Sequence, residues 1–416
     1  MITSVTRCRT FRYQLHPTFR QTQSLMRQLD YQCELYNAAL EERISAWRCE
    51  RRSISYFDQC RTLTGLQEFR PEVLSSGVRL CRGTLKRLDR AFVDFYVRVQ
   101  RDQKPGFPRF KSRSQFNSLQ WEDPNGWKLK LAEKRLVLPG VGEVKAKYHR
   151  TPLGIPKAIT VKQEGKKWWV SIRCADVPAE PLDPVGRQIG IDLGVTNLVA
   201  TSDGEIYASE RFGSKSARRI AEARQDIRRS QPDSNRRRKR VEQVAKLHRK
   251  VANQRRNAAH QLSRKLINEF DFIAVEDLEI SRMVRGPGLI KNQEVPRIVR
   301  KIVAARLHRS IYDAGWGMLL SMLLYKAESA GRVVKTVDPR HTSQMCAECG
   351  HVEARNRVSQ LSFRCLACGH RDHADVNAAR NILRAGRAQQ ASACGGHVKT
   401  ATLCPRSGYS FVAIAS

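Results

Sequence analysis

Residues 187–207, RQIGIDLGVTNLVATSDGEIY, predict two strands joined by a glycine turn. Asp192 lies inside the first apolar strand, where an ionised carboxylate is costly unless something binds it. We therefore interpret Asp192 as the first of three carboxylates that hold catalytic metal. The other two would be Glu276 and Asp375, which are far away in the sequence.

The second acid follows an apolar run in EFDFIAVEDL, residues 269–278. Residues 272–275 predict a short buried strand, and Glu276 and Asp277 lie at its carboxyl end, where sites in α/β sheets are commonly found. Helices are predicted around 296–313 and at 315–331, followed by a strand within 331–339. Strands alternating with helices in this way predict an α/β domain.

The third acid lies in RDHADVNAARNILRAG, residues 371–386, which predicts a helix capped by Asp372. An acid in a first helical turn commonly does no more than complement the helix dipole, so Asp375 taken alone does not define a site. Asn377 and the small pair Ala378-Ala379 would let this helix pack closely on a sheet and bring Asp375 to the strand ends.

Two CxxC pairs, Cys346/Cys349 and Cys365/Cys368, are separated by 15 residues, and each pair precedes a glycine. Four thiolates at this spacing suit one tetrahedral structural Zn²⁺. A redox dithiol would need only one such pair. A site closed by four sulfurs leaves no open position, so this zinc is expected to stabilise the fold and not to catalyse.

The chain is strongly basic. Its 416 residues contain 75 Lys and Arg against 40 Asp and Glu, a net charge of +35, which predicts a polyanionic partner and above all nucleic acid. The sequence contains neither an apolar run long enough to span a bilayer nor a signal-peptide pattern, so we expect no membrane partner and an intracellular location. Scattered cysteines outside the CxxC pairs favour a reducing compartment.

The basic residues concentrate in two segments. Residues 211–265 carry 19 Lys or Arg and 4 acids, with apolar positions at helical spacing on two long helices. This large excess of positive charge favours contact with a nucleic-acid backbone over a plain solvated surface, because like charges on one helix repel. The candidates are Arg236, Arg237, Arg238, Lys239, Arg240, Arg249, Lys250, Arg255 and Arg256.

The second basic segment is KPGFPRFKSRSQFNSLQ, residues 104–120, in which prolines and a glycine exclude helix. Basic and aromatic residues alternate there, which suits phosphate contact plus base stacking, although a basic surface strand with hydrophobic anchors fits equally well. The candidates are Lys104, Phe107, Arg109, Phe110 and Lys111. Helical stripes precede this segment, and alternating strands follow it with turns at Glu133-Lys134 and Gly165.

Together these motifs resemble the TnpB proteins encoded by bacterial and archaeal insertion sequences, relatives of the type V CRISPR effectors. The resemblance runs from residue 5 to about residue 385 and rests on GIDLGVTNL, IAVEDL, the double CxxC and DHADVNAARNIL. GFPRFKSR and the early helix LDYQCELYNAAL match the N-terminal pattern of the family. All three acid positions are present, unlike in the family's nuclease-dead regulators.

The resemblance implies an RNase H-like RuvC nuclease domain with an inserted four-cysteine zinc ribbon, and a wedge-like β-barrel of oligonucleotide-binding type with an inserted helical recognition lobe. The expected boundaries are 1–16 and 101–183 for the wedge, 17–100 for the lobe, 184–345 for the nuclease domain with basic helices 211–268, 346–368 for the ribbon and 369–385 for the last nuclease helix. Residues 386–416 match nothing in the family and are expected to form a disordered tail.

The resemblance also implies an RNA-guided endonuclease that cuts double-stranded DNA beside a short transposon-adjacent motif, with a guide RNA from the transposon end. Asp192, Glu276 and Asp375 would then bind two Mg²⁺, replaceable by Mn²⁺ in vitro, with Asp192 bridging the ions. The expected location is the prokaryotic cytoplasm, in association with the nucleoid when the protein is bound to DNA.

Four alternatives remain. The sequence IDLGVTN also resembles the first phosphate loop of actin-like ATPases and sugar kinases, but neither the second acidic glycine loop nor the glycine-rich adenosine site of that fold stands out in the sequence. A nucleic-acid-binding transposase accessory without cleavage conflicts with three intact carboxylates. A strand-transferring transposase would join transposon ends. A compact type V CRISPR effector with a CRISPR-encoded guide differs little from TnpB in sequence.

Overall fold

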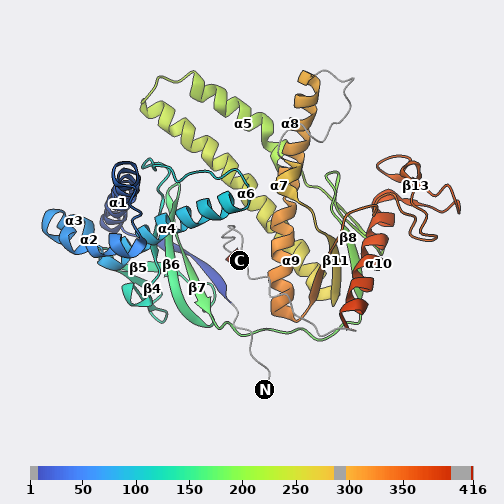
Figure 1. Ribbon diagram of the computed structural model, residues 1–416, viewed down its shortest axis with the longest axis horizontal. Coiled ribbons are helices and arrows are strands. Elements are labelled where there is room, and N and C mark those ends of the chain that lie inside the picture. The colour runs from blue at the N-terminus through green and yellow to red at the C-terminus, as the bar shows by residue number, and fades with distance from the viewer. Residues whose placement is uncertain (1–7, 285–296, 395–413, 416) are drawn as a thin grey trace. The chain divides into compact units, whose positions relative to one another are not determined.

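The computed structural model describes residues 8–284, 297–394 and 414–415. The chain divides into two compact units, one made of residues 1–178 with 405–416 and the other of residues 179–404 (Figure 1). Each unit has its own sheet and its own apolar core. Within the described residues, no helix is both long and apolar enough to span a bilayer.

Among its described residues the first unit contains four helices, and the first two begin at sequence-encoded caps. The helices are α1 (Phe19–Glu50), α2 (Tyr56–Phe69), α3 (Pro71–Leu74) and α4 (Val78–Gln100). Thr18 and Ser55 form capping boxes with Gln21 and Asp58, which satisfy amides at the start of α1 and α2. The stripe on α1 and the buried leucines of α4 belong to one core, which the sheet of this unit shares.

The sheet of the first unit has the order β2-β6-β7-β1-β5-β4-β3, with β15 parallel to β1. Because β1 pairs with both β5 and β7, helices α1–α4 interrupt a single sheet. The hairpins turn at Lys134 and Gly165, both with positive φ, which confirms the predicted turn positions. The strands are β1 (Arg9–His16), β2 (Ser118–Trp121), β3 (Lys128–Lys130), β4 (Arg135–Leu138), β5 (Gly142–Lys147), β6 (Ile155–Glu164), β7 (Lys167–Ala175) and β15 (Ile414–Ala415), with a short 3-10 turn, η1 (Pro124–Gly126), after β2.

The second unit is built on a mixed five-stranded sheet of order β10-β9-β8-β11-β12. The neighbours β8, β11 and β12 run parallel, whereas β9 and β10 complete an antiparallel meander from β8. This arrangement puts the carboxyl ends of three strands at one edge. The strands are β8 (Gln188–Asp192), β9 (Asn197–Thr201), β10 (Ile206–Ala208), β11 (Phe272–Glu276) and β12 (Val333–Val337).

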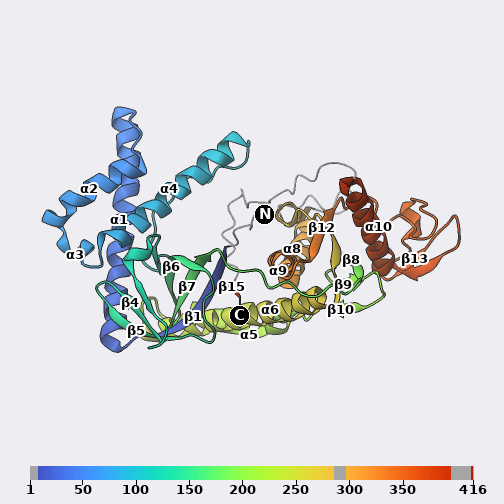
Figure 2. The ribbon, with the colours of Figure 1, turned by 90° about the horizontal axis from the view of Figure 1, so that it is seen from below.

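Helices cover both faces of this sheet. In β11, Ile273 and Val275 pack with apolar residues of α6 and α9, whereas Phe272 and Ala274 pack with α10. Figure 1 shows α9 and α10 on opposite faces, and Figure 2 shows α5 beside α6. The helices are α5 (Phe212–Arg228), α6 (Asn235–Glu269), α7 (Ile280–Met283), α8 (Arg297–Ala314), α9 (Trp316–Ala330) and α10 (Ala374–Cys394). The two long basic helices predicted from 211–265 are therefore confirmed as α5 and α6.

The last helix is longer than the sequence predicted. We expected it to end at residue 385 and a disordered tail to begin at 386, but α10 continues to Cys394. Gly386 packs against β11, where an added Cβ would lie 2.7 Å from Ala274 Cβ, and Arg387 Nε donates to Gln188 Oε1 at 2.7 Å. These contacts extend the helix along the sheet. Residues 395–413 and 416 of the predicted tail lie outside the described residues.

Candidate active site

Two of the three predicted acids are brought together by strand register. Asp192 and Glu276 are the last residues of β8 and β11, two parallel neighbours in which Ile191 pairs with Val275. The next residue along each strand is the acid, so the two carboxylates emerge side by side at the carboxyl edge of the sheet. Glu276 is only 9% exposed. An edge that brings together a buried and a half-buried acid needs positive charge nearby or protonation.

The third acid reaches the same edge through close helix packing. Gly190 in β8 has no side chain, and an added Cβ would lie 2.1 Å from the carbonyl oxygen of Ala379. This close approach lets α10 lie directly on β8, with Asp375 in its first turn. Asn197 of β9 donates from Nδ2 to Asp375 Oδ2 at 3.1 Å, so Asp375 is anchored to the sheet.

The three acids act on one another electrostatically. Burial raises the pKa of Asp192 to about 7, and the negative charges of Glu276 and Asp375 add to the increase. Burial also raises the pKa of Glu276, while a hydrogen bond from Thr342 and the charge of Arg357 oppose that increase. Such mutual repulsion is what a divalent cation between the carboxylates would relieve.

Three neighbours of the acids were missed by the sequence analysis. Arg357 pairs with Asp375, with 3.0 Å between Nη2 and Oδ1. Thr342 Oγ1 donates to Glu276 Oε1 at 2.5 Å, and Asn197 binds Asp375. Asn197 lies within the GIDLGVTNL motif but was not singled out there, Thr342 lies in no quoted motif, and Arg357 is one of 75 basic residues. Only the folded arrangement distinguishes these side chains.

The four predicted metal-binding cysteines form a compact cluster. All four sulfurs lie within 4.8 Å of one another, so they could hold a metal ion. The two CxxC turns are built alike: Gly350 N donates to the Cys346 carbonyl and Gly369 N to the Cys365 carbonyl, with both glycines at positive φ. The surrounding ribbon consists of η2 (Ala354–Asn356), β13 (Ser362–Arg364) and β14 (Arg371–His373).

Two buried asparagines tie this ribbon to α10. Asn377 donates to the Met345 carbonyl at 2.8 Å and accepts from the Ala347 amide at 2.9 Å. Asn381 donates to the carbonyls of Thr342 and Met345. Because Asp375 begins the same helix, the ribbon and the acid cluster share one support.

The predicted nucleic-acid segment at 104–111 is extended and largely exposed. Lys104, Arg109 and Phe110 are exposed, and Phe107 is 47% exposed. Lys111 is half-buried, and its backbone is held by Asn37 of α1 through hydrogen bonds of 2.8 and 2.9 Å. The backbone is thus fixed while most of the basic and aromatic side chains face solvent.

The predicted residues of α6 divide into two groups. Arg236, Arg238, Lys239 and Lys250 are exposed, whereas Arg237, Arg240, Arg249, Arg255 and Arg256 are half-buried. Arg237 donates to the Ile227 carbonyl and Arg240 pairs with Asp226, so these two hold α6 against α5.

Arg255 has an internal partner. It donates from Nε and Nη2 to Asp313 Oδ1 at 2.9 and 2.6 Å. Asp313 also accepts from the amides of Gly213 and Ser214, at the start of α5. Arg255 and Asp313 therefore join α5, α6 and α8.

Two family models match parts of the chain, from β6 of the first unit to α10 of the second unit. Residues 161–286 match the model described as "Probable transposase", of the OrfB type of IS605 elements, and residues 316–382 match the TNB domain of Cas12f1-like proteins. The first match contains Asp192 and Glu276, and the second contains Asp375, Arg357 and the four cysteines.

Relatives share most of the chain. InsQ of Escherichia coli (strain K12), named as an RNA-guided DNA endonuclease, is 34% identical over 317 residues, which cover 76% of each chain. A Streptomyces pristinaespiralis protein, also named as an RNA-guided DNA endonuclease, is 31% identical over 416 residues, covering 97% of this chain and 95% of that protein. The chain belongs to the TnpB family, the OrfB-type proteins of insertion sequences.

A solved structure shares the fold. The protein in a cryo-EM structure of a Cas12f1–sgRNA–target DNA complex aligns with a TM-score of 0.51 at 17% identity, covering 88% of this chain and 83% of that one. At this identity the likeness supports a common mixed α/β architecture.

Proposed function

We propose that this protein is an RNA-guided DNA endonuclease that cleaves double-stranded DNA beside a short adjacent motif, with a guide RNA from the transposon end. The observation that carries the proposal is the convergence of Asp192, Glu276 and Asp375 at one sheet edge, where the pKa of Asp192 is raised to about 7. We assign residues 184–345 and helix α10 to an RNase H-like domain of RuvC type, with the four-cysteine ribbon between them.

The three acids suit Mg²⁺. Their donors are hard carboxylate oxygens, and their mutual repulsion favours a cation. When bound, two Mg²⁺ would supply an activated water and stabilisation of the leaving alkoxide. Mn²⁺ would be an alternative in vitro.

The chain's own residues hold this arrangement. Asp192, the last residue of β8, would hold the metal together with Glu276 of the neighbouring strand β11. Thr342 fixes one oxygen of Glu276, and Asn197 and Arg357 each hold one oxygen of Asp375. These contacts fix the carboxylates before substrate arrives, which lowers the cost of assembling the site.

We assign one structural Zn²⁺ to Cys346, Cys349, Cys365 and Cys368. Four thiols within 4.8 Å match the tetrahedral preference of that ion. The ribbon would position Arg357 and, through Asn377 and Asn381, the start of α10.

We assign nucleic-acid contact to residues 104–111 and to the exposed basic residues of α6. The first unit would act as a wedge-like β-barrel, residues 1–16 and 101–183, with a recognition lobe, residues 17–100. In this scheme the protein contacts the adjacent motif and the backbone, and RNA–DNA pairing reads the remaining sequence. A charge of +35 suits this task.

The test is to purify the protein with its native locus, sequence the bound RNA and assay cleavage of matched double-stranded DNA. We expect RNA that overlaps the transposon end and cleavage that requires Mg²⁺. Asp192→Ala should abolish cleavage and retain the RNA, whereas Asp203→Ala, at an exposed ion pair with Arg187, should cleave normally. Metal-dependent cleavage by pure Asp192→Ala would overturn the site. A CRISPR-derived RNA would identify the compact effector instead.

A further inference from the structure

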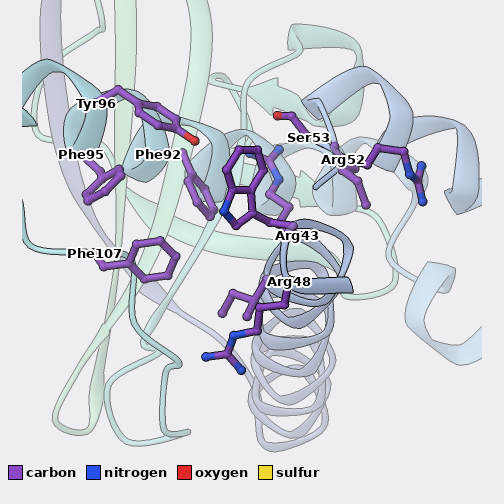
Figure 3. A pocket seen from close by; sticks show the side chains of 11 residues that line it. Arg43, Arg48, Arg52, Ser53, Phe92, Phe95, Tyr96 and Phe107 are labelled. Atoms are coloured by element: carbon purple, nitrogen blue, oxygen red, sulfur yellow. The ribbon is translucent and has the colours of Figure 1, made fainter. Parts of the chain in front are cut away.

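The first unit contains a pocket with an apolar lining that the catalytic site does not explain. It has a volume of about 610 Å³ and lies between the end of α1, the loop before α2, α4 and the segment around Phe107 (Figure 3). Its size is within the usual range for sites that bind small molecules or single groups of a larger ligand.

Aromatic rings form its walls. Phe92 and Phe95 of α4 meet the ring of Phe107 edge to face, with centroids 5.6 and 5.3 Å apart. Phe92 is buried and anchors the cluster, but Trp47 is 53% exposed, Tyr96 is 55% exposed and Phe107 is 47% exposed. Edge-to-face packing leaves ring faces open for a further flat group.

This exposure is costly for a cluster that serves only the core. Three large rings that line one cavity and remain half-exposed keep apolar area in contact with water, and such clusters commonly mark binding sites. A packing role accounts for Phe92. It does not account for the open rings of Trp47 and Tyr96.

Arginine side chains also line the pocket, and two of them already have acidic partners. Arg43 is already engaged: it pairs with Asp89 at 3.5 Å and lies over the Phe92 ring, 5.0 Å from its centroid. Arg52 pairs with Glu50 at 2.8 Å.

Arg48 differs from these neighbours. It is exposed at the pocket and makes no hydrogen bond or ion pair with any residue that the structure describes. Arg51 lies over the Trp47 ring, 5.9 Å from its centroid, and adds positive charge. The pocket thus combines half-exposed aromatic rings with a guanidinium available to an anion.

We propose that this pocket binds an unpaired nucleobase of a single-stranded nucleic acid, with Arg48 on a neighbouring phosphate. The inference rests on the proposed function for the presence of nucleic acid. A nucleobase is flat and has a π-face, so Trp47, Tyr96 and Phe107 can stack on it whatever its identity. A planar guanidinium suits the phosphate of the same strand. Binding therefore requires an unstacked base and excludes continuous duplex.

The test measures binding of labelled RNA and DNA oligonucleotides of about 12 nucleotides to the full chain without Mg²⁺ or guide, by fluorescence anisotropy. We expect Trp47→Ala with Tyr96→Ala to weaken binding roughly five- to 150-fold. Trp47→Phe with Tyr96→Phe should restore it. Phe69→Ala, 81% exposed and outside the pocket, is the matched control and should bind normally. Separate RNA and DNA arms identify the strand.

A second readout keeps the test independent of folding. Oligonucleotides with 4-thiouridine or 4-thiothymidine should crosslink to residues 47, 96 or 107, and Arg48→Gln should weaken binding and flatten its salt dependence. Crosslinks elsewhere, or equal affinity of the double variant and Phe69→Ala, would overturn the proposal. A change of oligomeric state in the double variant would instead assign the pocket to self-association. Cleavage is not measured here, so a nuclease failure and a pocket failure remain distinct.

Discussion

Arg357 and Asp375 form an ion pair of 3.0 Å, although Arg357 belongs to the four-cysteine ribbon and Asp375 to α10. Asp375 is 14% exposed in its side chain, so the pair is shielded from much of the screening that weakens surface pairs. The charge of Arg357 also lowers the pKa of both Asp192 and Glu276, against the effect of burial. The ribbon therefore contributes electrostatically to the acid cluster.

Arg357→Gln should shift the pH dependence of cleavage. Removing the cation raises the pKa values of Asp192 and Glu276 further, so their ionised forms appear only at higher pH. We expect the acidic limb of the pH–rate profile to move upward at fixed Mg²⁺. Arg355→Gln, 81% exposed in the same ribbon, should leave the limb in place. A uniform loss of rate at every pH would contradict the electrostatic role.

Metal-free protein should lose stability as pH rises from about 4 to 7. Asp192 has a folded pKa of about 7, above its ordinary value of 3.8, so the native state holds a proton that the unfolded chain releases. The contribution of Asp192 to the free energy of unfolding is fully present below its unfolded pKa. This contribution declines as pH rises through the folded pKa, with a slope approaching about 1.4 kcal/mol per pH unit for one carboxyl.

The measurement is urea unfolding at several pH values without divalent cations. Asp192→Asn removes this proton and should flatten the curve between pH 4 and 7. Mg²⁺ should stabilise the wild type more at pH 7 than at pH 5, because protons compete for the same oxygens. Parallel curves for wild type and variant would contradict the raised pKa.

Cys349→Ser should remove bound zinc and impair cleavage together. The ribbon supplies Arg357 and the carbonyls that Asn377 and Asn381 hold, so its loss should free the start of α10 and Asp375. Zinc content and proteolytic sensitivity of residues 346–373 are the measurements. Cys49→Ser, an exposed cysteine in the first unit, should keep zinc and activity. Full cleavage by a zinc-free variant would show that the zinc-bound ribbon is not needed to hold the catalytic acids in place.

The sequence predicted the parts of this site that local pattern encodes. Asp192 stands out as an acid placed within an apolar strand, which the structure shows it to end, Glu276 stands out at the end of an apolar strand, and the CxxC spacing identifies the ribbon. The GIDLGVTNL motif contains Asn197 but gives no sign of its contact with Asp375, and Arg357 lies in no motif, since tertiary packing creates both contacts.

Partner choice explains the other differences. The ion pair of Arg255 with a buried acid on α8 could not be predicted, because Asp313 lies 58 residues away in the sequence. The end of α10 was misplaced because the contacts of Gly386 and Arg387 with the sheet are long-range. The aromatic pocket joins α1, α4 and Phe107, and no single stretch of sequence contains it.

Gly190→Ala should damage both stability and cleavage without touching any acid. An added Cβ at Gly190 would lie 2.1 Å from the Ala379 carbonyl oxygen and 2.7 Å from the Leu383 amide nitrogen, so α10 must move off β8. Overpacking of this kind costs about 1–3 kcal/mol. Displacing Asp375 by about 1 Å should slow cleavage about a hundredfold.

The matched control is Gly65→Ala, in α2 of the first unit, where an added Cβ meets nothing within 4 Å. Because glycine inside a helix is less favourable than alanine by about 0.5–1 kcal/mol, this variant should be slightly more stable and fully active. Thermal unfolding and single-turnover cleavage measure both variants. If Gly190→Ala cleaves at the wild-type rate, α10 does not position Asp375 through its contact with β8, and the acid is held by Asn197 and Arg357 alone.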